Sequence, residues 1–141
     1  MRRADPRDTH PTFVHLRLHT EYSLVDGIVR VPALMQAVVE AGMPAVALTD
    51  HCNLFAMVKF YREALRQGVK PIIGVDVWLR EEGDRAEPVR LTLLAQNLDG
   101  YRNLTRLVSR SYLEGQDRGR PLLDRTWLDQ GTTAGLIALS G

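Results

Sequence analysis

The first segment of this sequence whose side chains could carry out chemistry is residues 13–19, close to the N-terminus. Apolar and polar residues alternate along it, which predicts a β-strand with one apolar and one polar face. The polar face carries His15, Arg17 and His19. Two imidazoles and a guanidinium on one face indicate a polar pocket rather than a solvated edge. Because parallel α/β folds gather functional groups at the carboxyl ends of strands, we expect His19 to line that pocket.

A second such segment is the apolar run 45–49, a predicted strand that ends directly in Asp50 and His51. Two more carboxylates, Asp26 and Asp76, fall at or just after the ends of predicted strands or in the loops that follow. The carboxyl ends of parallel strands meet at one rim of a sheet, so these side chains should converge there. The candidate ligands on that rim are His19, Asp26, His51 and Asp76.

Imidazoles and carboxylates on one rim can bind zinc, manganese or iron, and such a metal centre can activate water for phosphoester hydrolysis. The structural alternative is that each side chain caps a helix or satisfies backbone groups in its own loop. Asp50 could equally orient His51 or accept hydrogen bonds within the turn. For any one of these residues the structural alternative is the better explanation, whereas four on one rim favour a shared site.

Helical and strand patterns alternate along the rest of the chain, which predicts a parallel sheet with right-handed crossovers. Five strands are too few to close a (β/α) barrel. The sequence stops directly after a buried strand, so we expect an incomplete barrel cut within its domain: a polar tail over residues 1–12 and a truncated domain over 13–141. The predicted helices are 32–42, 57–68, 99–112 and 124–128, the further strands are 72–78, 90–95 and 136–139, and the predicted loops are 81–87 and 114–120.

Composition limits the possible classes of protein. The chain has 141 residues and a formal net charge of +1 with both signs mixed, so no electrostatic footprint for nucleic acid stands out. The lone cysteine, Cys52, excludes an internal disulfide and fits a reducing cytoplasm. The N-terminus lacks the apolar core of a signal peptide, and no apolar run is long enough to cross a bilayer. We therefore expect a soluble cytoplasmic protein.

Several separated motifs, in the same order, resemble the PHP domain (polymerase and histidinol phosphatase) at the N-terminus of bacterial replicative DNA polymerase III alpha subunits. The resemblance covers nearly everything after residue 12. It implies the first part of a distorted seven-stranded α/β barrel with a trinuclear metal site at its rim, fused to a polymerase whose catalytic acids lie much further along. The segments that carry the resemblance are residues 15–27, 48–54, 69–76, 91–95, 100–104 and 135–141.

The ligand positions that the resemblance implies are only partly kept. Metal-binding members begin with two histidines separated by one residue, whereas here the first is Arg17 and only His19 remains. Arg90 stands where a histidine ligand is expected, and Asp76 where a glutamate is usual. Arginine is always protonated and offers no lone pair to a metal. We therefore expect a metal-free network in which two guanidiniums supply the positive charge, with Asp26 and His51 as the remaining matched positions and His15 and Asp50 in support.

The resemblance also implies a function. The parent protein would be a DNA-directed DNA polymerase, a nucleotidyltransferase of DNA replication that uses magnesium, and none of the residues here would carry that reaction. In this family the region binds the separate proofreading exonuclease subunit, alongside other replicase subunits. We expect the segment to be a structural and docking module that reaches DNA only through the parent polymerase, with no cofactor of its own and no membrane contact.

Two alternatives stay open at this point. The first is a working phosphoesterase, such as an intrinsic proofreader or a pyrophosphatase, which would need zinc or manganese. The second is a stand-alone metal-dependent hydrolase of another barrel family, such as the amidohydrolases, which also open with paired histidines. Arg17 and the long colinear resemblance weaken the second alternative.

Overall fold

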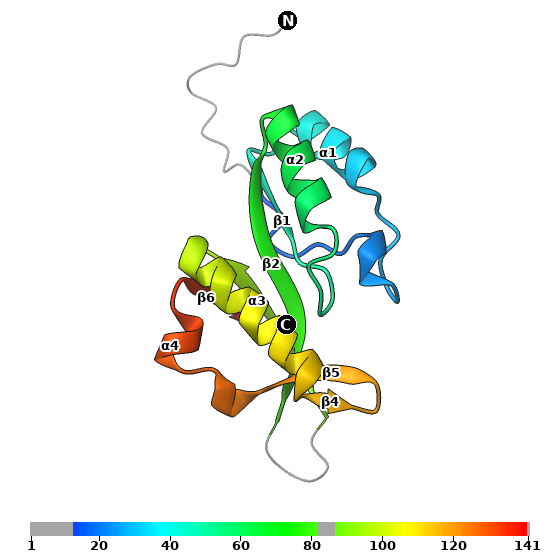
Figure 1. Cartoon of the computed structure of the whole chain (residues 1–141). Coiled ribbons are helices and arrows are strands. Elements are labelled where there is room, and N and C mark those ends of the chain that lie inside the picture. Colours follow the sequence, from blue (N-terminus) through cyan, green and yellow to red (C-terminus); the bar gives the residue numbers. More distant parts are fainter. Residues whose placement is uncertain (1–12, 82–86, 141) are drawn as a thin grey trace, which may run out of the picture.

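The computed structural model describes residues 13–81 and 87–140 (Figure 1). The tail predicted over residues 1–12 and most of the loop predicted over 81–87 therefore lie outside the described residues. The fold is mixed α/β, with a six-stranded sheet that contains both parallel and antiparallel pairs. No helix within the described ranges is long and apolar enough to span a membrane.

One long strand, β2 (Lys70–Arg80), organises the sheet (green in Figure 1). Along one edge, its first half pairs in parallel with β1 (Ala45–Leu48) and its last residues pair in parallel with β5 (Arg120–Asp124). On the opposite edge, the second half of β2 pairs antiparallel with β3 (Val89–Ala95), which in turn pairs antiparallel with β6 (Leu136–Ser140). β2 is thus shared by two half-sheets, one built with β1 and the other with β3, β5 and β6.

The prediction of an all-parallel sheet is wrong for β3 and β6. A parallel neighbour needs a crossover of a dozen or more residues, usually a helix. β2 and β3 are joined by residues 81–88 alone, which allows only an antiparallel return. The polar loop predicted over 114–120 also contains β4 (Gln116–Asp117), which pairs antiparallel with β5. A strand of two residues is too short for an alternating pattern to reveal it.

Three long helices form where the sequence predicted them: α1 (Val31–Glu40), α2 (Met57–Gln67) and α3 (Leu98–Leu113). α2 ends at Gly68, whose φ of 73° is the left-handed conformation that favours glycine. Asn97 caps α3 by accepting a hydrogen bond from its first turn. The remaining helical turns are η1 (Glu21–Ser23), η2 (Arg125–Trp127) and α4 (Gln130–Thr133).

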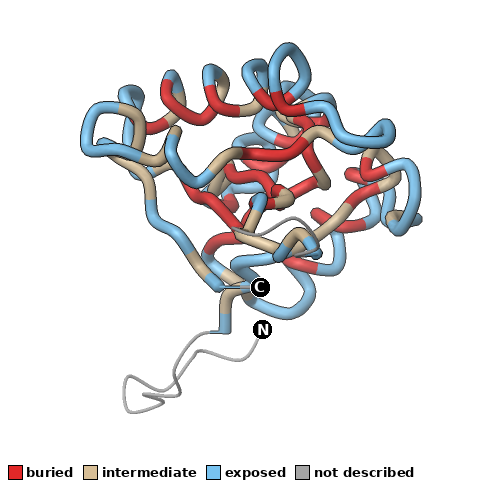
Figure 2. The backbone as a smooth tube through the Cα atoms, turned by 90° about the horizontal axis from the view of Figure 1, so that it is seen from below, coloured by how far each residue is buried: buried red, intermediate tan, exposed pale blue. Residues whose placement is uncertain are grey.

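Two apolar cores lie on the two halves of β2, and Figure 2 shows their backbone as buried segments surrounded by exposed helix surfaces. The first packs α1 and α2 against β1, with Leu48 and Phe60 buried. The second packs α3 against β2, β3 and β5 around Leu93 and Leu104. Ile73 packs against both cores, so the two half-sheets are coupled through the middle of β2.

Residues 13–19, predicted as the first strand, lie beside β1 without forming a regular strand. The backbone N–H groups of Ala47 and Thr49 donate to the carbonyl oxygens of His15 and Leu18. The donors are two residues apart and the acceptors are three apart, so the segment bulges and a regular ladder cannot continue. The prediction of a strand is wrong, although its position next to β1 keeps the segment at the sheet.

Asp76 lies in the middle of its strand, not at the strand end that the sequence indicated. β1 stops at Leu48, opposite Ile73, and one further parallel bridge joins His51 to Asp76. The middle of β2 is therefore level with the turn that follows β1. The predicted convergence of side chains arises because β2 continues where β1 ends.

Gly74 lies where β2 leaves β1 and joins β3, and a side chain there has no room. A Cβ atom would lie 2.6 Å from the carbonyl oxygen of Leu93 and 2.6 Å from a side-chain carbon of Leu94. Gly74→Ala should therefore lower the free energy of unfolding by about 3 kcal/mol, the upper end of the cost of overpacking.

Gly42→Ala is the matched control for this prediction. No atom lies within 4 Å of a Cβ at Gly42, and only its positive φ of 69° opposes a side chain. Its cost should be about 1 kcal/mol. Urea denaturation of the two variants measures both losses, and equal losses would contradict the crowding at Gly74.

Candidate functional site

A carboxylate buried in the middle of the sheet is the centre of the candidate site. Asp76 on β2 is fully buried. Arg17 Nε donates to its Oδ2 at 2.7 Å, His19 Nε2 lies 2.8 Å from the same oxygen, and the Thr92 hydroxyl donates to Oδ1. Burial would raise the pKa of Asp76, but the hydrogen bonds from His19, Thr92 and Arg17 outweigh it and hold the pKa at about 2. The carboxylate is therefore ionised at neutral pH.

Strand pairing explains the neighbours of Asp76. Asp76 and Trp78 share one face of β2, and β3 places Thr92 opposite Asp76 and Arg90 opposite Trp78. The Arg90 guanidinium stacks over the Trp78 ring at 4.2 Å from its centroid. Its Nη1 lies 3.6 Å from Asp76 Oδ2, and its Nη2 lies 3.8 Å from Asp26 Oδ2. The indole therefore holds a cation between the two carboxylates of the site.

His19 links the same two carboxylates. Its Nδ1 lies 3.1 Å from Asp26 Oδ2, and its Nε2 lies 2.8 Å from Asp76 Oδ2. The hydrogen bond to Asp76 is the main reason that the pKa of His19 is raised; burial opposes the rise, and the charge of Asp26 adds to it. Both ring nitrogens face carboxylates, and in the protonated ring both donate to them.

His51 stands beside this network without joining it. Its ring lies roughly parallel to that of His19, 6.4 Å away, and meets Trp78 edge to face at 5.4 Å. Its Nε2 is buried and has no hydrogen-bond partner within the described chain. Burial is the main reason that the pKa of His51 is lowered, and the charge of Arg90 lowers it further. His51 is therefore neutral at neutral pH.

Asp50 is buried behind the site, where it fixes the backbone that carries His19 and Asp26. Its carboxylate accepts hydrogen bonds from the Thr20 N–H at 2.5 Å, the Thr20 hydroxyl at 2.8 Å and the Ser23 hydroxyl at 2.9 Å. Neutral donors thus surround the carboxylate of Asp50, whereas most groups around the carboxylate of Asp76 are cationic or can become so. Asp50 thus acts as a hydrogen-bond acceptor for the segment that carries His19, and its donors come from that segment rather than from its own turn.

The structure brings most of the sequence-predicted residues together, and it also brings in residues that sequence reasoning missed. His15 lies apart from these residues: it is exposed, and its ring meets that of Phe13 edge to face. Thr92 and Trp78 were missed, although each lies two residues from a predicted site residue and so on the same face of its strand. The predicted residues that meet are Arg17, His19, Asp26, Asp76 and Arg90, with His51 alongside.

The donor chemistry of this site does not fit a metal centre. Within residues 13–81 and 87–140, no group of three or more His, Cys, Asp or Glu side chains is placed to hold a metal ion. Oδ2 of Asp76 already accepts from Arg17 and faces His19 and Arg90. Guanidiniums supply no lone pair to a metal, and the two beside Asp76 place positive charge next to its carboxylate.

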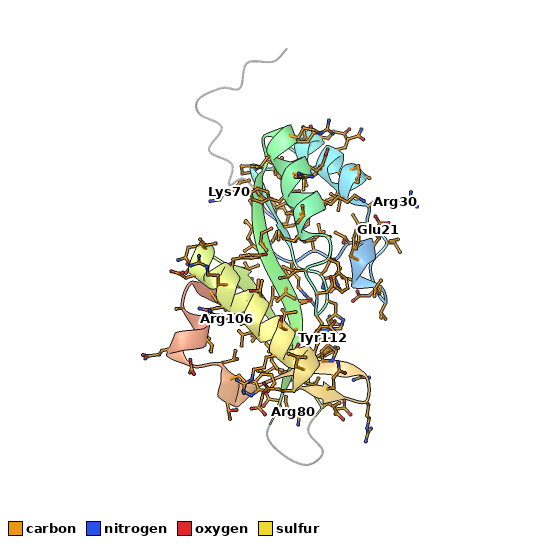
Figure 3. All side chains as sticks on the ribbon, in the orientation of Figure 1. Glu21, Arg30, Lys70, Arg80, Arg106 and Tyr112 are labelled. Carbon is orange, nitrogen blue, oxygen red and sulfur yellow. The ribbon has the colours of Figure 1, made fainter. Side chains whose placement is uncertain are left out.

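A cavity of about 530 Å³ opens beside the network. His51, Trp78 and Arg90 contribute to its lining, together with the more exposed Phe55 and Tyr112. Figure 3 shows Tyr112 near the carboxyl end of α3, next to the β4–β5 hairpin. The polar network therefore borders a space that a ligand or a partner side chain could enter.

Sequence comparison identifies proteins that this chain resembles. Residues 15–141 match the family model described as the PHP domain. The chain is 54% identical over 129 residues to the DNA polymerase III alpha subunit of Pseudomonas aeruginosa, 50% over 131 residues to that of Vibrio cholerae and 43% over 133 residues to that of Escherichia coli K12. These alignments cover 92–94% of the chain but only 11% of each relative.

Two solved structures share the fold. One is a protein from Bifidobacterium adolescentis described as a candidate metal-dependent phosphoesterase, with a TM-score of 0.51 and 15% identity, covering 71% of this chain and 32% of that one. The other is an amidohydrolase from Chromobacterium violaceum, with a TM-score of 0.50 and 19% identity, covering 71% of this chain and 36% of that one. At such low identities the likeness concerns the fold alone.

Removing the negative charge of Asp76 tests how much the stability of the protein depends on the ion pairs of this carboxylate. Asp76→Asn leaves Arg17, His19 and Arg90 without the carboxylate that they share. Breaking a buried pair from one side costs about 3–5 kcal/mol, so the variant should lose that much stability at neutral pH. Asp99→Asn, which removes an exposed carboxylate that pairs with Arg102, is the control and should cost less than about 1 kcal/mol. Comparable losses in urea denaturation would contradict the network.

The raised pKa of His19 predicts a pH dependence of definite sign. A pKa that is raised on folding stabilises the protein fully below the unfolded value of 6.5, and this contribution is lost as the pH rises through the folded value. The lowered pKa of His51 has the opposite sign: its contribution is present above 6.5 and is lost as the pH falls. The pH dependence of wild-type stability is therefore the sum of two contributions of opposite sign, one from His19 and one from His51.

Comparison with His19→Gln isolates the contribution of His19. The loss of stability caused by this substitution should be larger at about pH 5.5 than at about pH 8.5, because the protonated ring makes the stronger bonds to Asp26 and Asp76. Thermal unfolding at both pH values measures it. The same loss at both pH values would mean that the ring binds these carboxylates without a protonation change.

Proposed function

Since this chain belongs to the PHP domain family, we propose that it is the N-terminal part of a bacterial replicative DNA polymerase alpha subunit and acts there as a structural and docking module. The identities of 43–54% to three such subunits support this proposal. The chain spans 11% of the length of those relatives, so DNA synthesis, its magnesium and its DNA substrate would belong to the parent protein. We assign no polymerase catalytic residue to this chain.

We further propose that the site centred on Asp76 is a degenerate metal site that works without metal. The observation that carries this proposal is the direct hydrogen bond from Arg17 to Asp76, with Arg90 stacked on Trp78 beside it. Both oxygens of Asp76 already face donors, Arg17 and His19 on Oδ2 and Thr92 on Oδ1, so a metal ion would have to displace them and lie beside two guanidinium charges. The arginines would then hold together, by charge, the region that metals hold together in active relatives.

The complete domain would be a distorted seven-stranded barrel, of which this chain is the first part. The support is the family and the open arrangement of the described sheet, where β6 has β3 as its only strand neighbour. The partners of the domain would be the proofreading exonuclease subunit and the other replicase subunits, in the cytoplasm. Family resemblance supports these partners.

A metal-dependent phosphoesterase is the second candidate function. His51 Nε2 is buried without a partner, which is how an unfilled ligand position would look. The Bifidobacterium neighbour supports the fold of such an enzyme but not its chemistry here. Hydrolysis of a nitrophenyl phosphate diester that depends on added manganese and disappears in His51→Ala would favour this candidate over a docking module.

Docking and hydrolysis differ in their need for metal, so chelation separates them. The complete alpha subunit should bind the proofreading exonuclease with the same Kd before and after dialysis against EDTA, because arginines rather than metals would organise the domain. Calorimetric titration of the two dialysed proteins measures this. Loss of binding after EDTA, restored by zinc or manganese, would refute a metal-free docking module.

A further inference from the structure

We propose that the cavity beside the arginine network is a receptor for a protein segment that inserts a carboxylate between apolar side chains. This inference rests on the proposed docking function, and it identifies the chemistry of the docked segment. Apart from Arg90, which also belongs to the network, it uses residues that contribute no ion pair to Asp76. The cavity has an exposed apolar collar, buried polar groups without partners in its wall, and a second cation at its edge.

The collar is formed by side chains that border the cavity and yet face solvent. Leu24 is 78% exposed, Val25 is 91% exposed and Phe55 is 67% exposed. The loop that carries Leu24 and Val25 is fixed at its base, where the hydroxyl of Ser23 donates to Asp50 and accepts from the His51 N–H. Exposed apolar residues on a loop that hydrogen bonds hold in place are typical of a binding surface.

The wall of the cavity holds hydrogen-bonding capacity that the chain does not use. Nη1 of Arg90 is buried and has no acceptor within hydrogen-bond distance among the described residues, although Asp76 lies 3.6 Å away. His51 Nε2 beside it also lacks a partner. Buried polar groups are normally paired, so two unpartnered groups in one wall mark hydrogen-bonding capacity that a bound segment could use. The Arg90 side chain is 25% exposed and contributes to the lining of the cavity.

The mouth of the cavity carries a second cation. Arg120, at the start of β5, lines it and is exposed, and it forms no ion pair with any other residue that the structure describes. The one carboxylate in the lining, Asp26, is already paired with His19 and faces Arg90. An incoming anion would therefore meet one free cation and one partly free guanidinium, against a carboxylate whose charge is already matched.

A carboxylate within an apolar peptide fits this arrangement better than a free oxyanion. A phosphate ion would use the cations and leave Leu24, Val25 and Phe55 exposed. A segment with apolar side chains on either side of an aspartate or glutamate would cover the collar and pair the charge in one step. Aromatic walls such as Trp78 and Tyr112 are also typical of the central residues of protein interfaces.

The first experiment uses defined probes on the 141-residue chain. The acidic probe is the capped tetrapeptide acetyl-Leu-Asp-Phe-Leu-amide, and the neutral probe carries Asn in place of Asp. NMR titration of the Trp78 indole N–H should show the acidic probe binding at least about threefold more tightly than the neutral one, because a charge-assisted hydrogen bond is lost with Asn. Equal affinities, or no change at Trp78, would overturn the proposal.

Substitutions inside and outside the cavity lining test whether the two probes bind in the cavity. Arg120→Gln should abolish the preference for the acidic probe, whereas Arg118→Gln, in the same exposed hairpin but not in the cavity lining, should leave it unchanged. Phe55→Ser should weaken both probes, whereas Val58→Ser, exposed on α2 and outside the lining, should not. Inorganic phosphate that binds as tightly as the acidic probe, with no effect of Phe55→Ser, would mean a simple oxyanion site and would also overturn the proposal.

The same substitutions in the complete alpha subunit separate this inference from the function on which it rests. If the wild-type subunit binds the exonuclease and Arg120→Gln or Phe55→Ser weakens that binding by about threefold or more, the cavity is the docking site. If binding occurs but neither substitution affects it, the docking function stands and this cavity is not its receptor. If the wild-type subunit does not bind the exonuclease at all, the proposed function itself fails.

Discussion

An ionised carboxylate in the middle of a sheet is stable only if donors and cations surround it, and the structure around Asp76 meets this requirement from several segments at once. Arg17 and His19 reach it from the irregular N-terminal segment, and Thr92 and Arg90 reach it from β3. The pairing of one side chain thus ties the N-terminal segment to both half-sheets that share β2. Loss of that charge would loosen contacts far apart in the sequence.

The same network supplies positive charge to the carboxylates of the site from within the chain. Two guanidiniums can stabilise buried acids without any ion from solution, and Trp78 fixes one of them by stacking. Asp50 relies on hydroxyl and amide donors instead, so a second set of hydrogen bonds holds the start of the loop that borders the cavity. A cavity lies next to this network, and the proposed docking function would place a partner segment in it.

The sequence predicted most helices and the gathering of site residues, because both depend on local patterns. Helix α2, with its apolar stripe and terminal Gly68, is such a case. The direction of β3 was predicted wrongly, since alternation specifies a strand but not its partner, and only the short 81–88 connection carried that information. The participation of Thr92 and Trp78 depends on the register of β2 with β3, which single strands do not encode.

The central claim is that arginines replace metal charge at Asp76, and thermal unfolding with and without metal tests it most directly. A metal ion present at about 100 times its Kd stabilises a folded protein by about 2.7 kcal/mol. We predict that zinc or manganese at about 1 mM, and equally EDTA, leaves the Tm of the chain unchanged. A Tm that rises by several degrees with metal, falls with EDTA and loses both responses in Asp76→Asn would contradict the account.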